Sequence, residues 1–485
     1  MTVGDDSSAP PRVAVIGGGV SGLAAAHRLT EILPHAELAL FEAADRLGGV
    51  LETVRRDGFL VERSADSFIT KYPWATDLCR RIGLSDQLVP TNESRRRALV
   101  VRGGELMRVP DAFVLMTPNK AWSILATRVL SWRGKLRLLA EPFVPRRKGS
   151  ELGDESVGSF ATRRLGREAY ERLVQPLLGG IHTADADRLS MAATFPEFMA
   201  QEQYHGHLLR GRSALAESGA RYGMFVAPRD GVSSLVRAIA ARLRDGVVRL
   251  NTPVMELTRG ESGRWQVELG DGRAESFDAV IVALPAPAAA KLLVKLDGEL
   301  SAELAAIEYA SCAVVCSAYR REQFGRPPDG FGFVVPRIEQ RPIIAASFAS
   351  EKFPGRAPQG EVLIRAFIGG ALAPALAELP ADELQRIAHQ ELASLMHVSG
   401  LPLWSEVVRW RASMPQYHVG HLQRVAQIES RVAQLHGLEL AGNAYHGVGI
   451  PQCIHSGETA AERVANGTAG GKPNLTNRST PGLSC

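Results

Sequence analysis

Three glycines near the start of the chain, Gly17, Gly19 and Gly22, have the G-x-G-x-x-G spacing of a phosphate-binding turn. Such glycines allow a tight turn, close approach of a pyrophosphate to bare backbone, and tight packing of the next helix. Glu42 lies 20 residues after Gly22, where a carboxylate can accept hydrogen bonds from ribose hydroxyls. We therefore expect a dinucleotide site here. Its expected contacts are Gly17, Gly18, Gly19, Val20, Ser21, Gly22 and Glu42.

The elements that must hold this turn are visible in the apolar pattern. Residues 13–16 form a continuous apolar run, typical of a strand buried on both faces of a parallel sheet. Apolar residues at helical spacing follow over 23–29, and a second run occupies 38–41. The sequence thus predicts a strand–helix–strand unit with the glycine turn between strand and helix.

A second glycine pair follows the second expected strand. Glu42, Arg46, Gly48 and Gly49 have the order E-x-x-x-R-x-G-G, which resembles the flavoprotein extension of the dinucleotide fingerprint. The glycine pair would let the chain pass close to a pyrophosphate. This pattern favours FAD over NAD, with Ala43 as a further contact, although Arg46 alone is also typical of a solvated loop.

The far end of the chain contains a second strand–loop–helix pattern. A strand is expected at 438–441, and a helix should run from Pro451 to Gly467. The backbone N–H groups of Val448, Gly449 and Ile450 would then lie at a helix N-terminus, which carries about half a positive charge. Facing a flavin ring, with Asn443 nearby, they would stabilise the negative charge that builds up on reduction. The alternative is an ordinary strand–loop–helix.

Composition excludes several classes of protein. The 485 residues carry a formal net charge of +4, which gives no reason to expect a nucleic acid partner. The five cysteines are scattered, so we expect neither a disulfide framework nor a metal site. Neither a signal segment nor a membrane-spanning run is visible, and we expect a cytoplasmic location.

We expect an α/β fold with three parts. These are a discontinuous Rossmann-like FAD-binding domain with a parallel βαβ sheet, an α+β substrate domain and a helical insertion. The expected ranges are 1–72, 222–300 and 425–466 for the FAD-binding domain, 73–90 and 301–424 for the substrate domain, 91–221 for the helical part, and 467–485 for a disordered tail.

Within the helical part, residues 121–139 place apolar side chains on one helical stripe with basic residues beside it. The stripe consists of Trp122, Leu125, Val129, Trp132, Leu136 and Leu139. A basic amphipathic helix can lie in a membrane interface. A helical insertion packed on the core has the same pattern, so both interpretations stay open.

Four longer stretches allow a more specific assignment: GGIHTADADRLS (179–190), GFGFVVP (330–336), MPQYHVGH (414–421) and GNAYHGVGIPQCI (442–454). With both flavin elements, they make the chain up to about residue 466 resemble the FAD-dependent porphyrinogen oxidases of haem biosynthesis. These are the protoporphyrinogen and coproporphyrinogen III oxidases within the amine-oxidase-like flavoproteins.

The resemblance implies further site residues. FAD contacts would include Ser64, Ala65, Asp66, Ser67, Val254 and Trp410. Substrate contacts would be Arg97, Phe331, Val334 and Phe367, with Arg97 anchoring a propionate and the apolar residues lining the macrocycle. The chain has Ser64 and Ala65 where the family usually has Gly-Pro, and His182 where tyrosine is more common. No catalytic residue is assigned, because the flavin can take a hydride without a general base.

The implied reaction is a six-electron oxidation of a porphyrinogen by non-covalent FAD and O2. The residues leave open which porphyrinogen is preferred, whether O2 or another acceptor is used, and whether the chain forms a homodimer or contacts a membrane or the next haem-pathway enzyme. An amine or polyamine oxidase, or a non-catalytic escort protein on the same fold, is the alternative function.

Overall fold

The computed structural model describes residues 10–110, 113–114, 116–118, 121–147, 153–208 and 223–468. The tail expected at 467–485 lies outside this part of the chain except for its first two residues, which end the last helix. Among the described residues, no helix combines the length and apolar character needed to span a bilayer.

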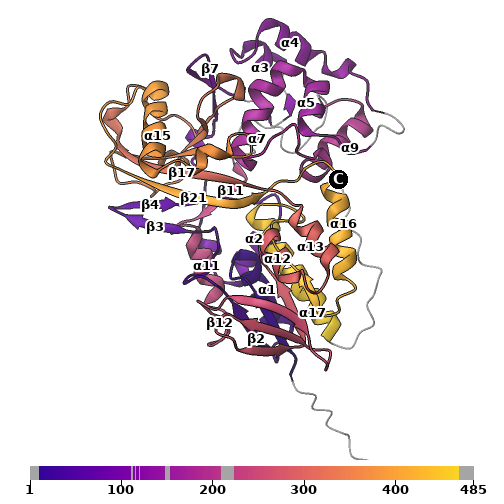
Figure 1. Cartoon of the computed structure of the whole chain (residues 1–485). Coiled ribbons are helices and arrows are strands. Elements are labelled where there is room, and N and C mark those ends of the chain that lie inside the picture. The colour runs from indigo at the N-terminus through magenta and orange to yellow at the C-terminus, as the bar shows by residue number, and fades with distance from the viewer. Residues whose placement is uncertain are drawn as a thin grey trace, which may run out of the picture.

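A five-stranded parallel sheet forms the lower part of the molecule (Figure 1). Its order is β12 (Val248–Arg249), β2 (Glu37–Phe41), β1 (Arg12–Ile16), β16 (Ala279–Val282) and β22 (Leu438–Leu440). Helix α1 (Val20–Ile32) follows β1 and leads to β2. The predicted βαβ unit and the parallel sheet are confirmed, and strands from distant parts of the sequence complete them.

Each face of this sheet is covered by a different layer because side chains alternate along a strand. Val13 and Val15 pack into a core with α1, α2 (Trp74–Arg81), α11 (Val232–Ala240) and α17 (Ile450–Thr468). Ala14 and Ile16 pack into the opposite core. That core contains the sheet of β13 (Val254–Arg259), β14 (Trp265–Leu269) and β15 (Ala274–Phe277), with α12 (Ala286–Leu293), α13 (Gly298–Ala305) and α16 (His421–Val432).

A seven-stranded mixed sheet forms the second body. Its order is β21 (Trp404–Pro415), β17 (Tyr309–Arg320), β20 (Glu361–Gly369), β19 (Ile343–Phe348), β18 (Gly332–Val334), β7 (Leu99–Arg102) and β8 (Glu105–Arg108). Helix α15 (Ala381–Met396) covers one face. On the other face, Phe59 of the hairpin β3 (Thr53–Arg56) and β4 (Phe59–Glu62) packs against Val314. A small sheet joins β5 (Phe68–Ile69) and β6 (Leu88–Pro90), which follow the hairpin in sequence, to the distant strand β11 (Phe225–Pro228) between them.

The third body is helical and lies at the top of Figure 1. It contains α3 (Ala121–Ala126), α4 (Trp132–Leu139), α5 (Val157–Leu165), α6 (Arg167–Ala169), α7 (Gln175–His182), α8 (Met191–Thr194) and α9 (Pro196–His205). The expected single helix over 121–139 is wrong: residues between Ala126 and Trp132 break it, and Val129 is buried. The break turns Val129 into the core and leaves Trp122 and Trp132 exposed.

Two stretches pack with a different body from the domain that we expected for them from the sequence. Strands β7 and β8 fall within 91–221, yet β7 pairs in parallel with β18 of the seven-stranded sheet. Helix α2, expected in the substrate domain, packs through Leu78 and Cys79 on the core of the parallel sheet. Both contacts are between residues distant in sequence, which local patterns do not encode.

Helices α1 and α17 cross at a glycine. A Cβ built on Gly457 of α17 would lie 2.1 Å from the carbonyl oxygen of Ser21, a backbone atom that cannot move aside alone. Gly467 near the end of the same helix has no described atom within 4 Å of such a Cβ. The close crossing places the start of α17 beside the first glycine turn.

We expect Gly457→Ala to destabilise the protein by roughly 1–3 kcal/mol, because the added methyl group overpacks the α1–α17 contact. The matched substitution Gly467→Ala should leave stability within about 0.5 kcal/mol. Urea unfolding followed by far-UV circular dichroism measures both. Equal unfolding midpoints for the two variants and the wild type would contradict this packing argument.

Candidate flavin site

The predicted motifs meet at one edge of the parallel sheet. Parallel strands end at the same edge, so the residues that follow β1, β2, β16 and β22 are brought together there. Gly17 N donates to Phe41 O at 2.8 Å, and Ala283 N donates to Ile16 O at 2.8 Å. The strand order also reverses between β1 and β16, which is where ligands bind in open α/β sheets.

The three glycines of the first turn have different reasons to be glycine. Gly17 has φ +109°, and a Cβ built on it would lie 2.6 Å from Ala283 O. A Cβ on Gly22 would lie 1.9 Å from Gly17 O. Gly19 has φ −67°, and no described atom lies within 4 Å of a Cβ built there. The protein itself therefore requires Gly17 and Gly22, whereas Gly19 leaves open space of the kind that a pyrophosphate would fill.

Glu42 is held in place by the turn that it serves. Its Oε2 accepts a hydrogen bond from Gly18 N at 2.7 Å, and its Oε1 accepts one from Ala44 N at 2.8 Å. Each carboxylate oxygen keeps a further lone pair for a ribose hydroxyl. Thr252 N donates to Glu42 O at 2.9 Å, which brings Val254, at the start of β13, to the same edge.

The second glycine pair lies directly against the first turn. Gly48 N donates to Gly18 O at 2.8 Å, and Gly19 and Gly48 form an isolated parallel bridge. Arg46 is not a solvated loop residue, because its Nη2 donates to Gly49 O at 2.7 Å and lies 3.5 Å from a carboxylate oxygen of Glu52. The arginine thus braces the glycine pair.

The stretch 63–67 is fixed from the seven-stranded sheet. Trp410 Nε1 donates to Arg63 O at 2.7 Å, and Arg365 donates to Ser64 O. Lys352 Nζ lies 2.7 Å from Asp66 Oδ1. Burial alone would raise the pKa of Asp66, but the Lys352 and Arg365 cations outweigh it and hold that pKa well below its ordinary value. Sequence reasoning missed Lys352 and Arg365, because neither belongs to a local motif.

The two replacements of Gly-Pro fit this stretch without disturbing it. Ala65 is exposed, and the Ser64 hydroxyl is a buried oxygen with no hydrogen-bond partner among the described residues. The backbone carbonyl of Ser64 stays bonded to Arg365 of the sheet. The Ser64 hydroxyl is thus a candidate contact for a bound group, together with Asp66 and Ser67, whose hydroxyl donates to Asp66 at 2.7 Å.

The closing loop has the predicted geometry. Helix α17 begins at Ile450, directly after Val448 and Gly449. Among the described residues, no atom accepts a hydrogen bond from the N–H groups of Val448 and Gly449. Burial raises the pKa of Cys453 in the first turn to about 12, so its thiol is neutral and a poor nucleophile. This fits a flavin held without a covalent bond.

The expected substrate residues divide into two groups. Val334, Ala345 and Phe367 lie in one row across β18, β19 and β20. Phe331 precedes β18, and its backbone N–H donates to Arg97 O at 2.8 Å. The Arg97 guanidinium lies 2.7 Å from Asp329 Oδ1, an oxygen that Arg95 also contacts at 2.7 Å. Arg97 is therefore paired with a carboxylate of the protein.

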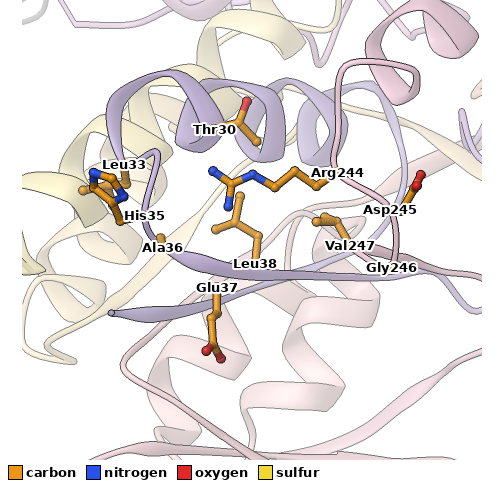
Figure 2. A pocket seen from close by; sticks show the side chains of 10 residues that line it. All are labelled: Thr30, Leu33, His35, Ala36, Glu37, Leu38, Arg244, Asp245, Gly246 and Val247. Carbon is orange, nitrogen blue, oxygen red and sulfur yellow. The ribbon is translucent and has the colours of Figure 1, made fainter. Parts of the chain in front are cut away.

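A cavity of about 300 Å³ lies elsewhere, at the amino end of β2 (Figure 2). Thr30, Leu38 and Arg244 line it together with the stretch 245–247. This is the edge of the parallel sheet opposite to the glycine turns. The cavity is therefore separate from the flavin site. No group of three or more metal-ligating side chains occurs among the described residues.

Comparisons with known proteins show the family to which the chain belongs. The family model for flavin containing amine oxidoreductases matches residues 20–465. A coproporphyrinogen III oxidase of Bacillus subtilis is 33% identical, with 94% of this chain and 98% of that protein covered. A protoporphyrinogen oxidase of Arabidopsis thaliana is 29% identical, with 93% of both covered.

Solved structures show the same fold. A crystal structure from Exiguobacterium sp., described as a protoporphyrinogen oxidase, has a TM-score of 0.85 and 31% identity, covering 94% of this chain and 98% of that one. UDP-galactopyranose mutase has a TM-score of 0.71 at 16% identity and shows the fold alone, covering 94% of this chain and 93% of its own. The chain belongs to the flavin containing amine oxidoreductase family and is an FAD-dependent oxidoreductase.

Proposed function

We propose that the protein oxidises a porphyrinogen to the porphyrin in haem biosynthesis, with O2 as the electron acceptor. The substrate is protoporphyrinogen IX or coproporphyrinogen III. The observation that carries the proposal is the match to named coproporphyrinogen III and protoporphyrinogen oxidases over more than nine-tenths of the chain. The amine oxidase alternative fits less well, because the curated relatives that are 29–33% identical are named coproporphyrinogen III oxidase or protoporphyrinogen oxidase.

The proposed mechanism depends on binding and orientation. Bound FAD supplies the acceptor for the hydride that leaves a methylene bridge of the macrocycle. Glu42 would hold the ribose, and the bare backbone at Gly19 and Gly48 would face the pyrophosphate. The free N–H groups of Val448 and Gly449 would donate to the negative charge that develops on reduction. Val334 and Phe367 would hold the macrocycle over the flavin ring. The reaction would then depend on this orientation rather than on a general base.

Gly19 tests the cofactor half of the proposal. We expect Gly19→Val to fold with the same melting temperature as the flavin-free wild type, because no described atom lies within 4 Å of a Cβ built there. The variant should lose its flavin absorbance, since the valine occupies the place of the pyrophosphate. Visible absorbance of the purified proteins and thermal melts of the flavin-free proteins measure the two effects. Full flavin content in the variant would contradict the site.

Arg97 tests the substrate half. Under air, the purified protein should generate porphyrin fluorescence from at least one of the two porphyrinogens. We expect Arg97→Gln to raise KM about tenfold with little change in kcat, because a charged hydrogen bond to a propionate is lost. Arg95→Gln, which removes the other partner of Asp329, is the matched control and should leave KM unchanged. Failure to oxidise either porphyrinogen would overturn the proposed function.

We further propose a peripheral membrane contact through the helical body. The large apolar side chains exposed around α3 and α4 include Trp122 (79%), Trp132 (68%), Leu136 (63%) and Phe143 (87%). Arg128 and Arg133 are exposed beside them, whereas Lys135 is buried and donates to Leu125 O at 2.7 Å. Exposed aromatic residues with arginines suit an anionic lipid interface. A second copy of the chain, or the next haem-pathway enzyme, would be the other occupants of this surface.

A lipid test separates these occupants. We expect the wild type to co-sediment with vesicles that contain anionic phospholipid, and the double variant Trp132→Ser, Phe143→Ser to bind at least about fivefold more weakly, since apolar burial is lost. Size-exclusion chromatography of the same proteins reports self-association. Wild-type protein that stays in the supernatant would contradict the membrane contact.

A further inference from the structure

Three of the four stretches that carry the resemblance meet at one place. The stretch 414–421 lies between the end of α7 and the closing flavin loop. Ser190 N donates to Tyr417 O at 2.7 Å, Val419 N donates to Arg188 O at 3.0 Å, and Leu189 forms an antiparallel bridge with His418. The backbone around Tyr417 therefore pins the stretch 188–190.

The Tyr417 side chain points the other way, to the flavin loop. Its hydroxyl donates to Asn443 O at 2.6 Å and accepts from Gly447 N at 2.8 Å. One oxygen thus joins both ends of the loop 443–447, and it uses the donor and an acceptor that a tyrosine hydroxyl offers. The side chain is 5% exposed, so water does not substitute readily for these bonds.

His421 adds a third bond to the same loop. Its ring stacks on the Tyr417 ring, with centroids 3.9 Å apart and 11° between the planes. Nε2 lies 3.2 Å from Tyr445 O, and because a carbonyl only accepts, Nε2 must carry the proton. Burial lowers the pKa of His421 to about 4, so the imidazole is neutral near pH 7.

The middle of the loop is anchored in the core, where Ala444 and Tyr445 are buried, whereas its two ends are bordered by glycines. Gly442 has φ +141° and Gly447 has φ +131°, so glycines with wide conformational freedom border it on both sides. The loop leads directly to Val448 and Gly449, whose N–H groups find no acceptor in the described part of the chain. A change at Tyr417 would therefore move the groups that face the flavin ring.

The same tyrosine is connected to the substrate side. The stretch that it pins follows α7, where a Cβ built on Gly180 would lie 3.1 Å from Val334 Cγ1. Gly180 thus packs against one of the residues expected to hold the macrocycle. Tyr417 thus contacts both the segment that follows α7 and the flavin loop.

We propose that Tyr417 is a positioning residue that fixes the loop 443–449 at the flavin ring and couples it to the α7 segment on the substrate side. The proposal rests on the proposed placement of the ring at the start of α17. It gives a physical role to the stretch 414–421, one of those that carry the family resemblance.

The test compares two buried tyrosines. Tyr417→Phe keeps the ring and its stacking on His421 but removes both loop bonds. Tyr319→Phe is the matched control, because Tyr319 is fully buried and its hydroxyl lies 3.1 Å from His389 Nδ1, within the core under α15. Both variants lose a buried hydrogen bond, but only Tyr417→Phe releases the flavin loop.

We expect Tyr417→Phe to raise the FAD dissociation constant of the flavin-free protein about tenfold, measured by flavin fluorescence on titration. The flavin midpoint potential should become more negative, and the visible flavin band should shift, because the N–H groups move away from the ring. Tyr319→Phe should match the wild type in all three. Should Tyr417→Phe not fold, His421→Phe should show the same directions with about a threefold effect.

Wild-type values in Tyr417→Phe, or equal changes in Tyr319→Phe, would overturn the proposal. A wild-type protein that binds FAD but oxidises neither porphyrinogen would overturn the proposed function alone, because the cofactor measurements remain valid. A weaker FAD affinity of Tyr417→Phe with an unchanged flavin potential and spectrum would overturn the positioning role of Tyr417. The loop would then stabilise the fold without facing the flavin ring.

Discussion

The architecture depends on one steric requirement: a dinucleotide phosphate must approach backbone that no side chain covers. Gly17 and Gly22 would be glycine in this fold without any ligand, because a Cβ at either would collide with backbone. Gly19 has room for a side chain in the protein alone. The missing side chain of Gly19 is explained only if a bound group fills this space. The N-terminus of the helix that follows β1 attracts an anion to the same place.

Most of the cofactor site could be predicted from local sequence patterns, because the strand, turn and helix around Gly17 to Gly22 are neighbours along the chain. The roles of Lys352, Arg365 and Tyr417 could not be predicted in this way. Each acts on a segment brought close only by the tertiary fold, at Asp66, Ser64 and the loop 443–447. For the same reason the parallel pairing of β7 with β18, and the break between α3 and α4, were invisible in the periodicity.

The contacts also explain why stretches far apart in sequence occur together. The ends of α7, β21 and β22 meet, so a residue at one must suit the other two. Ser190, Tyr417 and Asn443 belong to three separate stretches, yet two hydrogen bonds through Tyr417 connect them. A motif of this kind records a tertiary contact rather than a local structure. For this reason the order of these stretches along the chain indicated the family, whereas the spacing of residues within them indicated no particular chemistry.

Charge is used sparingly at the proposed ring site. The Lys352 and Arg365 cations face the carboxylate of Asp66, which leaves backbone dipoles as the main electrostatic groups at the start of α17. A helix N-terminus contributes at most about 2 kcal/mol, or roughly 40 mV for a two-electron couple. The effect falls off within the first turn of the helix. Such a weak, short-range field can tune a flavin only if the loop before the helix is held still. Gly442 and Gly447 border the loop, and the hydroxyl of Tyr417 is the group that bonds to both of its ends.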